Sequence, residues 1–357
     1  MEYLYEYLGF LARAVTIVVA LLIIMSTAIA SGMRRQVSTD AHLEITALNK
    51  QFEDMKEQLT ETFLNPDQLK IEQKKQAKEK KKTEKERKKA LKSRDSAGSD
   101  YTELEGCRKR LFVLAFDGDV QASRVEALRH EVTAILTGIR EQDSVLVCID
   151  SAGGMVHTYG LAASQLERFK QRGVKLIAAV DKVAASGGYL MATTADEIIA
   201  APFALVGSIG VVAQIPNVHR LLKKYDVDVD ILTAGKFKRT LTTLGENTEE
   251  GRAKFIEELN DVHKLFQEFV SENRPMLDIE EVSTGEAWYG RRALEKKLVD
   301  TLMTSDEYIM QACEDADVFL VRWVEHKKPI ERFMAQLGKL AHKTVDEINY
   351  QMPWSAK

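Results

Sequence analysis

The sequence predicts an α/β domain built on a largely parallel sheet, preceded by an N-terminal transmembrane helix and a charged helical spacer. Three observations support this: an apolar run near the N-terminus, a lysine-rich segment after it, and, from residue 111, short β-rich runs alternating with amphipathic helical patterns. The chain of 357 residues is 45% hydrophobic, which is enough for a buried core. We divide it into an anchor (1–35), a helical and Lys-rich spacer (36–100), a main domain (101–305) and a C-terminal extension (306–357).

The membrane anchor is expected at residues 10–30, which are almost entirely apolar and reach the roughly 20 positions that a spanning helix needs. A cleaved signal peptide is the alternative, because residues 28–30 (AIA) have the small-x-small pattern of a cleavage site. The acidic residues Glu2 and Glu6 stand where a signal peptide carries positive charge. We therefore favour a retained helix in contact with the lipid bilayer.

The spacer begins with apolar positions at helical spacing over residues 40–65 and continues into the lysine-rich run 70–94. One interpretation of this run is a patch for anionic lipid or nucleic acid. The other is a solvated, partly helical link between membrane and domain. No aromatic residue interrupts the run to stack on bases, so we favour the link and expect no nucleic-acid partner.

The main domain shows the alternation of strands and helices that is typical of βα units. Strands are expected at residues 111–116, 145–149, 175–180, 197–200 and 229–233. Helices are expected at residues 123–138, 156–171, 187–194, 249–273 and 293–297. In such sheets, ligands bind outside the carboxyl ends of the strands, so strand-to-helix turns are where chemistry is expected.

Metal and disulfide chemistry find little support. The cysteines Cys107, Cys148 and Cys313 are an odd number without metal-ligand spacing, and Cys148 fits a buried core position. The 7 histidines are dispersed. We expect no metal and no cofactor.

The first turn of interest is residues 150–154 (DSAGG), where a strand ends and a helix begins. Adjacent glycines leave backbone N–H groups free to point into a crevice at the sheet edge. A plain tight turn has the same pattern, so the two glycines alone are weak evidence.

The second turn is residues 181–189 (DKVAASGGY), in which Ser186 lies between small residues and is followed by two glycines and a helix. Such a turn exposes a hydroxyl nucleophile and offers N–H groups to an oxyanion. It resembles the G-x-S-x-G turn of hydrolases without matching it. A helix N-cap is the alternative role for Ser186.

Four segments in this order resemble the SppA/SohB (signal peptide peptidase A) family of serine proteases. They are residues 151–154 (SAGG), 185–189 (ASGGY), 207–211 (GSIGV) and 234–239 (AGKFKR). Residues 285–300 are similar to the family's closing motif, so the resemblance covers roughly 111–302. It implies a ClpP/crotonase-like fold with repeated ββα-type units. One departure is Ala152, which stands where the family usually has proline and loosens the loop.

The resemblance also implies a role for each matching residue. Ser186 corresponds to the nucleophile, Lys238 to the general base, and Ser208 to the hydroxyl that holds the lysine. The oxyanion hole corresponds to the N–H groups of Gly153 and Ser186, with Gly154 as a further donor.

A lysine base makes a physical demand on its surroundings. With a reference pKa of about 10.4, a solvated lysine is protonated near neutrality, so apolar walls must desolvate it. Phe237 beside Lys238 and the expected strand 229–233 are compatible with such burial, whereas Lys236 and Arg239 could remain outside.

The function implied is that of a membrane-anchored serine endopeptidase with a Ser/Lys dyad. It would cleave membrane-associated peptides such as remnant signal peptides or misfolded proteins. Because the chain carries one copy of the motif set, the resemblance further implies a homo-oligomer with shared active sites.

The family places its catalytic domain on the periplasmic side of the bacterial cytoplasmic (inner) membrane. Arg34 and Arg35 instead favour the cytoplasm, but long domains translocate despite their charge, so we expect the periplasm.

Two other functions are compatible with parts of this sequence. A crotonase-type acyl-CoA enzyme would share the fold and the paired N–H groups, but it usually needs a carboxylate in the pocket and does not explain an anchor. A non-enzymatic membrane scaffold would use the lysine run. Only the protease hypothesis predicts that Ser186 reacts with a fluorophosphonate probe.

Overall fold

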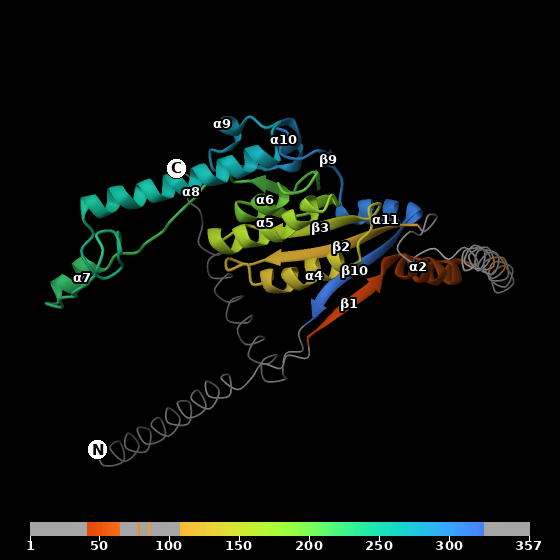
Figure 1. The fold of residues 1–357 in the computed structure, drawn as a ribbon, viewed down its shortest axis with the longest axis horizontal. Coiled ribbons are helices and arrows are strands. Elements are labelled where there is room, and N and C mark those ends of the chain that lie inside the picture. The colour runs from red at the N-terminus through yellow and green to blue at the C-terminus, as the bar shows by residue number, and fades with distance from the viewer. Residues whose placement is uncertain (1–40, 65–77, 79–84, 86–107, 325–357) are drawn as a thin grey trace, which may run out of the picture. The chain divides into compact units, whose positions relative to one another are not determined.

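A ten-stranded sheet organises the residues that the computed structural model describes, which are 41–64, 78, 85 and 108–324 (Figure 1). Its main path runs through β1 (His42–Ala47), β10 (Ala316–Val324), β2 (Lys109–Gly118), β3 (Ser144–Ser151), β4 (Lys175–Val180), β6 (Glu197–Ala200) and β9 (Thr301–Leu302). A branch leaves this path at β3 and comprises β5 (Val183–Ala185), β7 (Leu205–Gly207) and β8 (Ala287–Tyr289).

From β10 to β9 the strands of the main path pair in parallel. Parallel strands need long crossover connections, which here include α4 (Val125–Gly138) and α5 (Val156–Gln171). Both faces of the central strands are covered: Val145 and Val147 belong to the core cluster that includes residues of α4 and α5, whereas Leu146 belongs to a second cluster. That second cluster includes residues of α2 (Leu48–Phe63) and α11 (Ser305–Asp315). Burial on both faces explains the continuous apolar runs in the sequence.

Most of the expected elements are confirmed. The strands expected at 111–116, 145–149, 175–180 and 197–200 are β2, β3, β4 and β6. The helices expected at 123–138, 156–171, 187–194, 249–273 and 293–297 correspond to α4, α5, α6 (Gly187–Ala192), α8 (Glu249–Asn273) and α10 (Gly290–Glu295). α8 begins where the Thr248 hydroxyl accepts a hydrogen bond from Gly251 N–H, and Glu249 and Glu250 in its first turn suit the helix dipole.

The strand expected at 229–233 is wrong. In the described chain, residues 225–248 form neither helix nor strand. β-propensity over this stretch has no neighbouring strand to pair with, and its apolar side chains lie outside the core, with Ile231 42% and Leu232 93% exposed.

The sheet extends beyond the main domain that the sequence indicated. Residues 306–324, expected in a C-terminal extension, form most of α11 and all of β10, which pairs in parallel with β2. Residues 42–63, expected in the spacer, form β1 at the edge of the sheet and α2 on one face.

Among residues 41–64, 78, 85 and 108–324, no helix has the length and apolar character needed to cross a bilayer. The span expected at 10–30 lies outside this part of the chain. So does the lysine-rich run 70–94, apart from Lys78 and Lys85.

An ion pair anchors the C-terminal end of α8. Arg274, only 1% exposed, donates hydrogen bonds to both carboxylate oxygens of Asp300 at 2.7 and 2.8 Å. It also donates to the Lys297 carbonyl at 2.9 Å, and Asp300 in turn accepts from Ile198 N–H at 2.7 Å. The pair therefore ties α8 to the strand β6.

We predict that Asp300→Ala lowers the free energy of unfolding by about 3–5 kcal/mol, because it leaves the Arg274 charge buried without a partner. The matched control is Glu295→Ala, which breaks the exposed ion pair with Arg292 and should cost less than about 1 kcal/mol. Denaturant titration of both variants measures the difference, and equal losses would contradict the anchoring role.

Candidate functional site

Three neighbouring strands end side by side and deliver the expected site residues. In the parallel pairing of β3 with β5, Ser151 is opposite Ala184, and in the pairing of β5 with β7, Ala185 is opposite Gly207. The glycine turn, Ser186 and Ser208 therefore follow the ends of adjacent strands, which lie about 4.8 Å apart. The structure brings these three segments together as the sequence indicated.

Ser186 occupies a constrained turn between β5 and α6. Its φ of 51° and ψ of −118° lie where a residue with a Cβ rarely sits, which costs on the order of 1–3 kcal/mol. Its carbonyl accepts from Leu190 N–H at 2.9 Å, so it stands at the N-cap position of α6. Its side chain, however, makes no capping hydrogen bond. The hydroxyl is thus left available for other contacts.

The glycine loop lies directly against this turn. A Cβ added to Gly153, whose φ is 87°, would stand 2.8 Å from the Ser186 Cβ and 2.7 Å from the Gly187 nitrogen. A Cβ on Gly154 would overlap the Val120 carbonyl. Both positions therefore require glycine, for space at each and for conformation at Gly153.

Two of the backbone donors that the sequence indicated are engaged within the protomer. Ser186 N–H donates to the Gly207 carbonyl at 2.8 Å, and Gly153 N–H donates to the Ser151 hydroxyl at 3.1 Å. Within the described residues, the N–H groups of Gly154 and Gly187 donate to no protein acceptor. These two groups are therefore donors left free in the glycine loop and in the turn that carries Ser186.

Ser208 lies next to Ser186 but is engaged elsewhere. Its N–H donates to the Glu286 carbonyl at 2.6 Å, and its hydroxyl donates to the Gly285 carbonyl at 3.3 Å. The turn that carries it has positive φ at both Gly207 and Ser208. The hydroxyl is within the site but contacts no lysine in the described chain.

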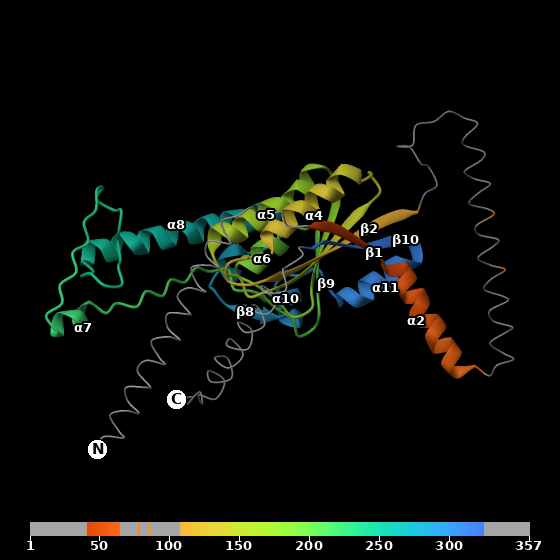
Figure 2. The same ribbon diagram turned by 90° about the horizontal axis from the view of Figure 1, so that it is seen from below.

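The segment that carries Lys238 lies away from the strand ends. It connects α7 (His219–Lys224) to α8 and projects from the sheet together with the N-terminal part of α8 (Figures 1 and 2). The Lys238 side chain is exposed, and among the described residues it has no side-chain partner. Lys236, by contrast, pairs with Glu250 at 2.6 Å and lies over the Phe237 ring. The structure therefore does not bring Lys238 to Ser186 within one protomer.

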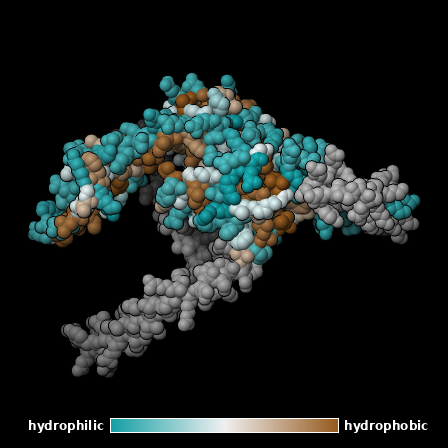
Figure 3. Space-filling model, in the orientation of Figure 1, coloured by the Kyte–Doolittle hydropathy of each residue, from teal (hydrophilic) through white to brown (hydrophobic). Residues whose placement is uncertain are grey.

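We call residues 211–256 the arm. Internal hydrogen bonds order it: the Asn217 amide donates to the carbonyls of Thr242 and Gly245 at 2.9 and 3.0 Å. The arm nevertheless exposes many large apolar side chains, which form some of the brown patches in Figure 3. They are Val212, Ile215, Val218, Leu221, Tyr225, Val227, Ile231, Leu232, Phe237, Leu244 and Ile256.

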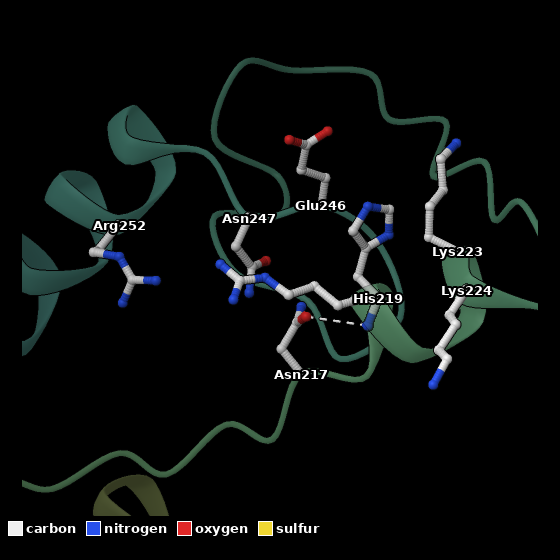
Figure 4. A pocket seen from close by; sticks show the side chains of 8 residues that line it. Asn217, His219, Lys223, Lys224, Glu246, Asn247 and Arg252 are labelled. Carbon is white, nitrogen blue, oxygen red and sulfur yellow. Dashed lines mark hydrogen bonds between the residues drawn. The ribbon is translucent and has the colours of Figure 1, made fainter.

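The arm also contains a cavity of about 730 Å³ with a largely basic lining (Figure 4). It is lined by Asn217, His219, Arg220, Lys223, Lys224, Glu246, Asn247 and Arg252. None of the expected catalytic residues contributes to it, so the cavity is distinct from the strand-end site.

Two observations on the described residues concern metal and thiol chemistry. No group of three or more His, Cys, Asp or Glu side chains there is placed to hold a metal ion. Burial raises the pKa of the Cys148 thiol to about 12, so it is not a thiolate nucleophile near neutrality.

Tyr159 is a site residue that the sequence did not reveal. It lies on α5, is fully buried, and its hydroxyl reaches Ser151 in the glycine turn. A tyrosine on the apolar face of a helix is indistinguishable from a core residue until the fold shows what its hydroxyl meets.

Comparison with known proteins connects this geometry to a family. Residues 2–166 match the family described as peptidase family S49 N-terminal, and residues 168–319 match peptidase family S49. A Haemophilus influenzae protein named "Probable protease SohB" is 56% identical over 231 residues, which are 65% of this chain and 65% of that protein. Two relatives from Buchnera aphidicola match a larger part of this chain. One, named "Probable protease SohB", is 42% identical over 93% of this chain and 94% of the relative. The other, named "Putative protease SohB", is 38% identical over 98% of this chain and 98% of the relative. With similarity along nearly its whole length, the chain belongs to peptidase family S49, and more closely to its SppA/SohB members.

Proposed function

We propose that this peptidase is a serine endopeptidase in which Ser186 is the nucleophile and Lys238 the general base. The observation that carries the proposal is the Ser186 turn, which has positive φ at the N-terminus of α6 and lies against two obligatory glycines. Turns of this kind expose nucleophilic hydroxyls in hydrolases. Family membership favours peptide substrates over the acyl-CoA alternative. The branch β5–β7–β8 beside the main sheet supports assignment of the ClpP/crotonase-like fold.

For the oxyanion hole we propose the N–H groups of Gly154 and Gly187. The family resemblance points to Gly153 and Ser186, with Gly154 as a further donor, but the N–H groups of Gly153 and Ser186 already donate to Ser151 and Gly207. Gly187 is the first residue of α6, where N–H groups lack intrahelical acceptors and the helix dipole favours negative charge. Two free donors, one in the glycine loop and one next to Ser186 in its turn, suit an oxyanion that forms at this hydroxyl.

The proposed reaction is acyl transfer in two steps. Neutral Lys238 takes the Ser186 proton as the Oγ atom attacks the peptide carbonyl, and the two N–H groups stabilise the oxyanion. When the C–N bond breaks, the lysine ammonium gives its proton to the leaving amine. Water, deprotonated by Lys238, then attacks the acyl-enzyme, and the lysine ammonium returns this proton to Ser186 Oγ as the ester C–O bond breaks. The residues named supply every proton transfer, so the proposed reaction needs no cofactor.

We propose further that the dyad forms between protomers of a homo-oligomer. A lysine base must be desolvated, but Lys238 is exposed in the protomer. It is carried by an arm whose exposed apolar side chains need a cover, and burial of these side chains would supply the dry surroundings. Ser208, beside Ser186, is placed to accept the incoming lysine through its hydroxyl.

We predict that Ser186→Ala and Lys238→Ala each lower kcat/KM for an unstructured peptide substrate by at least about 10³-fold. Either change removes an atom that the reaction uses, and thermal unfolding should remain near that of the parent protein. The matched control is Lys236→Ala, which removes a neighbouring exposed lysine and its surface ion pair with Glu250. We expect less than about a threefold change for this control.

A fluorophosphonate probe checks the nucleophile directly. It should label the parent protein and Lys236→Ala rapidly, Lys238→Ala slowly, and Ser186→Ala not at all. Full activity in either Ser186→Ala or Lys238→Ala would reject the dyad. Failure of the parent protein to label or cleave would favour the membrane-scaffold alternative.

Mixing subunits tests whether the dyad is shared. Ser186→Ala and Lys238→Ala proteins, co-expressed with different tags, should regain a measurable part of the parent activity, because some interfaces then pair an intact serine with an intact lysine. Tandem purification isolates the mixed oligomers for the assay. Mixed oligomers as inactive as either variant alone would place the dyad within one chain.

For substrates and location we propose membrane-associated polypeptides, cleaved by a domain that residues 10–30 anchor to the bacterial inner membrane. The apolar character of that segment supports the anchor, and its length matches a bilayer. We place the catalytic domain in the periplasm, although Arg34, Arg35 and the run 70–94 carry positive charge next to the span.

Fractionation and protease protection check this placement. We expect the full-length protein to stay with carbonate-washed membranes, and externally added protease to degrade the domain in intact spheroplasts. Recovery in the soluble fraction would contradict the anchor. Protection until the spheroplasts are lysed would place the domain in the cytoplasm instead.

A further inference from the structure

A buried pair of hydroxyls lies behind the glycine loop. The Tyr159 hydroxyl is 2.5 Å from the Ser151 hydroxyl and donates to the Asp119 carbonyl at 2.7 Å. Ser151 in turn accepts the Gly153 N–H at 3.1 Å. Tyr159 is 0% and Ser151 2% exposed, so water does not compete for these contacts.

The protons define a direction for this chain of hydrogen bonds. Each hydroxyl carries one hydrogen, and Tyr159 donates its hydrogen to the Asp119 carbonyl. The Ser151 hydrogen therefore serves the short contact to Tyr159, and it is shared with the Gly118 carbonyl, which lies 3.1 Å from the Ser151 hydroxyl. The order is then Gly153 N–H to Ser151 to Tyr159 to the Asp119 carbonyl. Such chains strengthen each bond cooperatively in a buried setting. Burial also raises the pKa of Tyr159, which keeps its hydroxyl protonated as a donor.

The Tyr159 ring packs against the turn that carries Ser186. A Cβ at Gly187 would overlap carbon atoms of the ring, so the tyrosine packs directly against the residue that follows the nucleophile. At Gly118, a Cβ would stand 2.6 Å from both hydroxyl oxygens, so glycine there leaves the space that the pair occupies. One side chain therefore touches the nucleophile turn and, through Ser151, holds the glycine loop.

The loop is held by close backbone contacts at both glycines, by the hydrogen bond from Met155 N–H to the Val120 carbonyl at 2.8 Å, and by the bond from Gly153 N–H to Ser151. Gly153 and Gly154 are adjacent glycines, which have more backbone freedom to lose than any other residue. The hydrogen bond from Gly153 N–H to Ser151 fixes the first peptide plane. The next N–H, that of Gly154, is one of the two donors assigned above to the oxyanion.

We propose that Tyr159, acting through Ser151, is a positioning residue that sets the placement of the Gly154 N–H relative to the Gly187 N–H in the oxyanion hole. The role rests on the proposed function. Tyr159 itself touches no substrate, and its effect is on where the donors stand when the oxyanion forms.

The test is Tyr159→Phe in the full-length protein, which removes the hydroxyl but keeps the ring against Gly187. We expect kcat to fall about tenfold or more with KM changed less than about threefold, because a displaced donor weakens transition-state binding most. Affinity for a peptide boronic acid should fall by a similar factor. Ser151→Ala should behave alike, and the double variant should be no worse than either single variant, because both break the same chain.

Tyr189→Phe is the matched control. Tyr189 is also a fully buried tyrosine, lies on the helix behind Ser186, and donates one hydrogen bond to the Leu298 carbonyl at 2.9 Å. It has no bond to the glycine loop. Its loss should lower thermal stability about as much as Tyr159→Phe does, but leave kcat within about threefold of the parent value. Equal effects of the two variants on kcat, or additive losses in the double variant, would overturn the positioning role.

A second measurement does not depend on activity. Amide hydrogen exchange of the peptide containing residues 151–154 should accelerate about tenfold or more in Tyr159→Phe and remain unchanged in Tyr189→Phe. Unchanged exchange in Tyr159→Phe would overturn the inference even if the peptidase is active. Absence of Ser186-dependent hydrolysis together with accelerated exchange would instead reject the proposed function and leave the structural link intact.

Discussion

The parallel pairing of β3, β5 and β7 is the constraint on which the site depends. It fixes where three strand ends emerge, so the glycine turn, Ser186 and Ser208 become neighbours although they are far apart in the chain. The pairing continues past β5 through the hydrogen bond from Ser186 N–H to the Gly207 carbonyl. That bond aligns the nucleophile and at the same time uses up its N–H group. The free donors therefore come from the residues that follow, Gly154 and Gly187.

Local sequence patterns were sufficient to predict the helices, strands and turns that depend mainly on their own residues. Apolar runs and helical spacing predicted most of the central strands and long helices, and glycine next to small residues predicted both turns. The prediction failed where the outcome depends on distant partners. Residues 229–233 have strand propensity but no strand to pair with, whereas β10 pairs with β2, more than two hundred positions earlier in the chain. Similarly, the hydrogen-bond partners of Ser151 and Ser186 follow from register, which no local pattern encodes.

The two residues of the proposed dyad need different environments, and a single protomer provides only the one that Ser186 needs. Ser186 needs a rigid turn with free donors, and the core supplies it through close glycine contacts and the packing of Tyr159. Lys238 needs a dry pocket, yet the arm leaves it exposed among apolar side chains that are themselves uncovered. Lys236, with Glu250 and Phe237 as partners, already has the environment of an ordinary surface lysine.

The way in which α8 is held explains why the arm needs a further contact. Its 25 residues span roughly 37 Å, but Val270 is its one fully buried residue in the described chain, and the Arg274–Asp300 pair follows its C-terminal end. A helix fixed at one end acts as a lever, so a tilt of about 5° moves the far end by about 3 Å over this length. Proton transfer requires the donor and acceptor atoms to lie within about 3 Å of each other. A helix held only at its C-terminal end cannot keep Lys238 at that distance from a hydroxyl. The proposed role of Lys238 therefore requires a second contact far from the Arg274–Asp300 pair, and the exposed apolar side chains of the arm are the surface suited to make it.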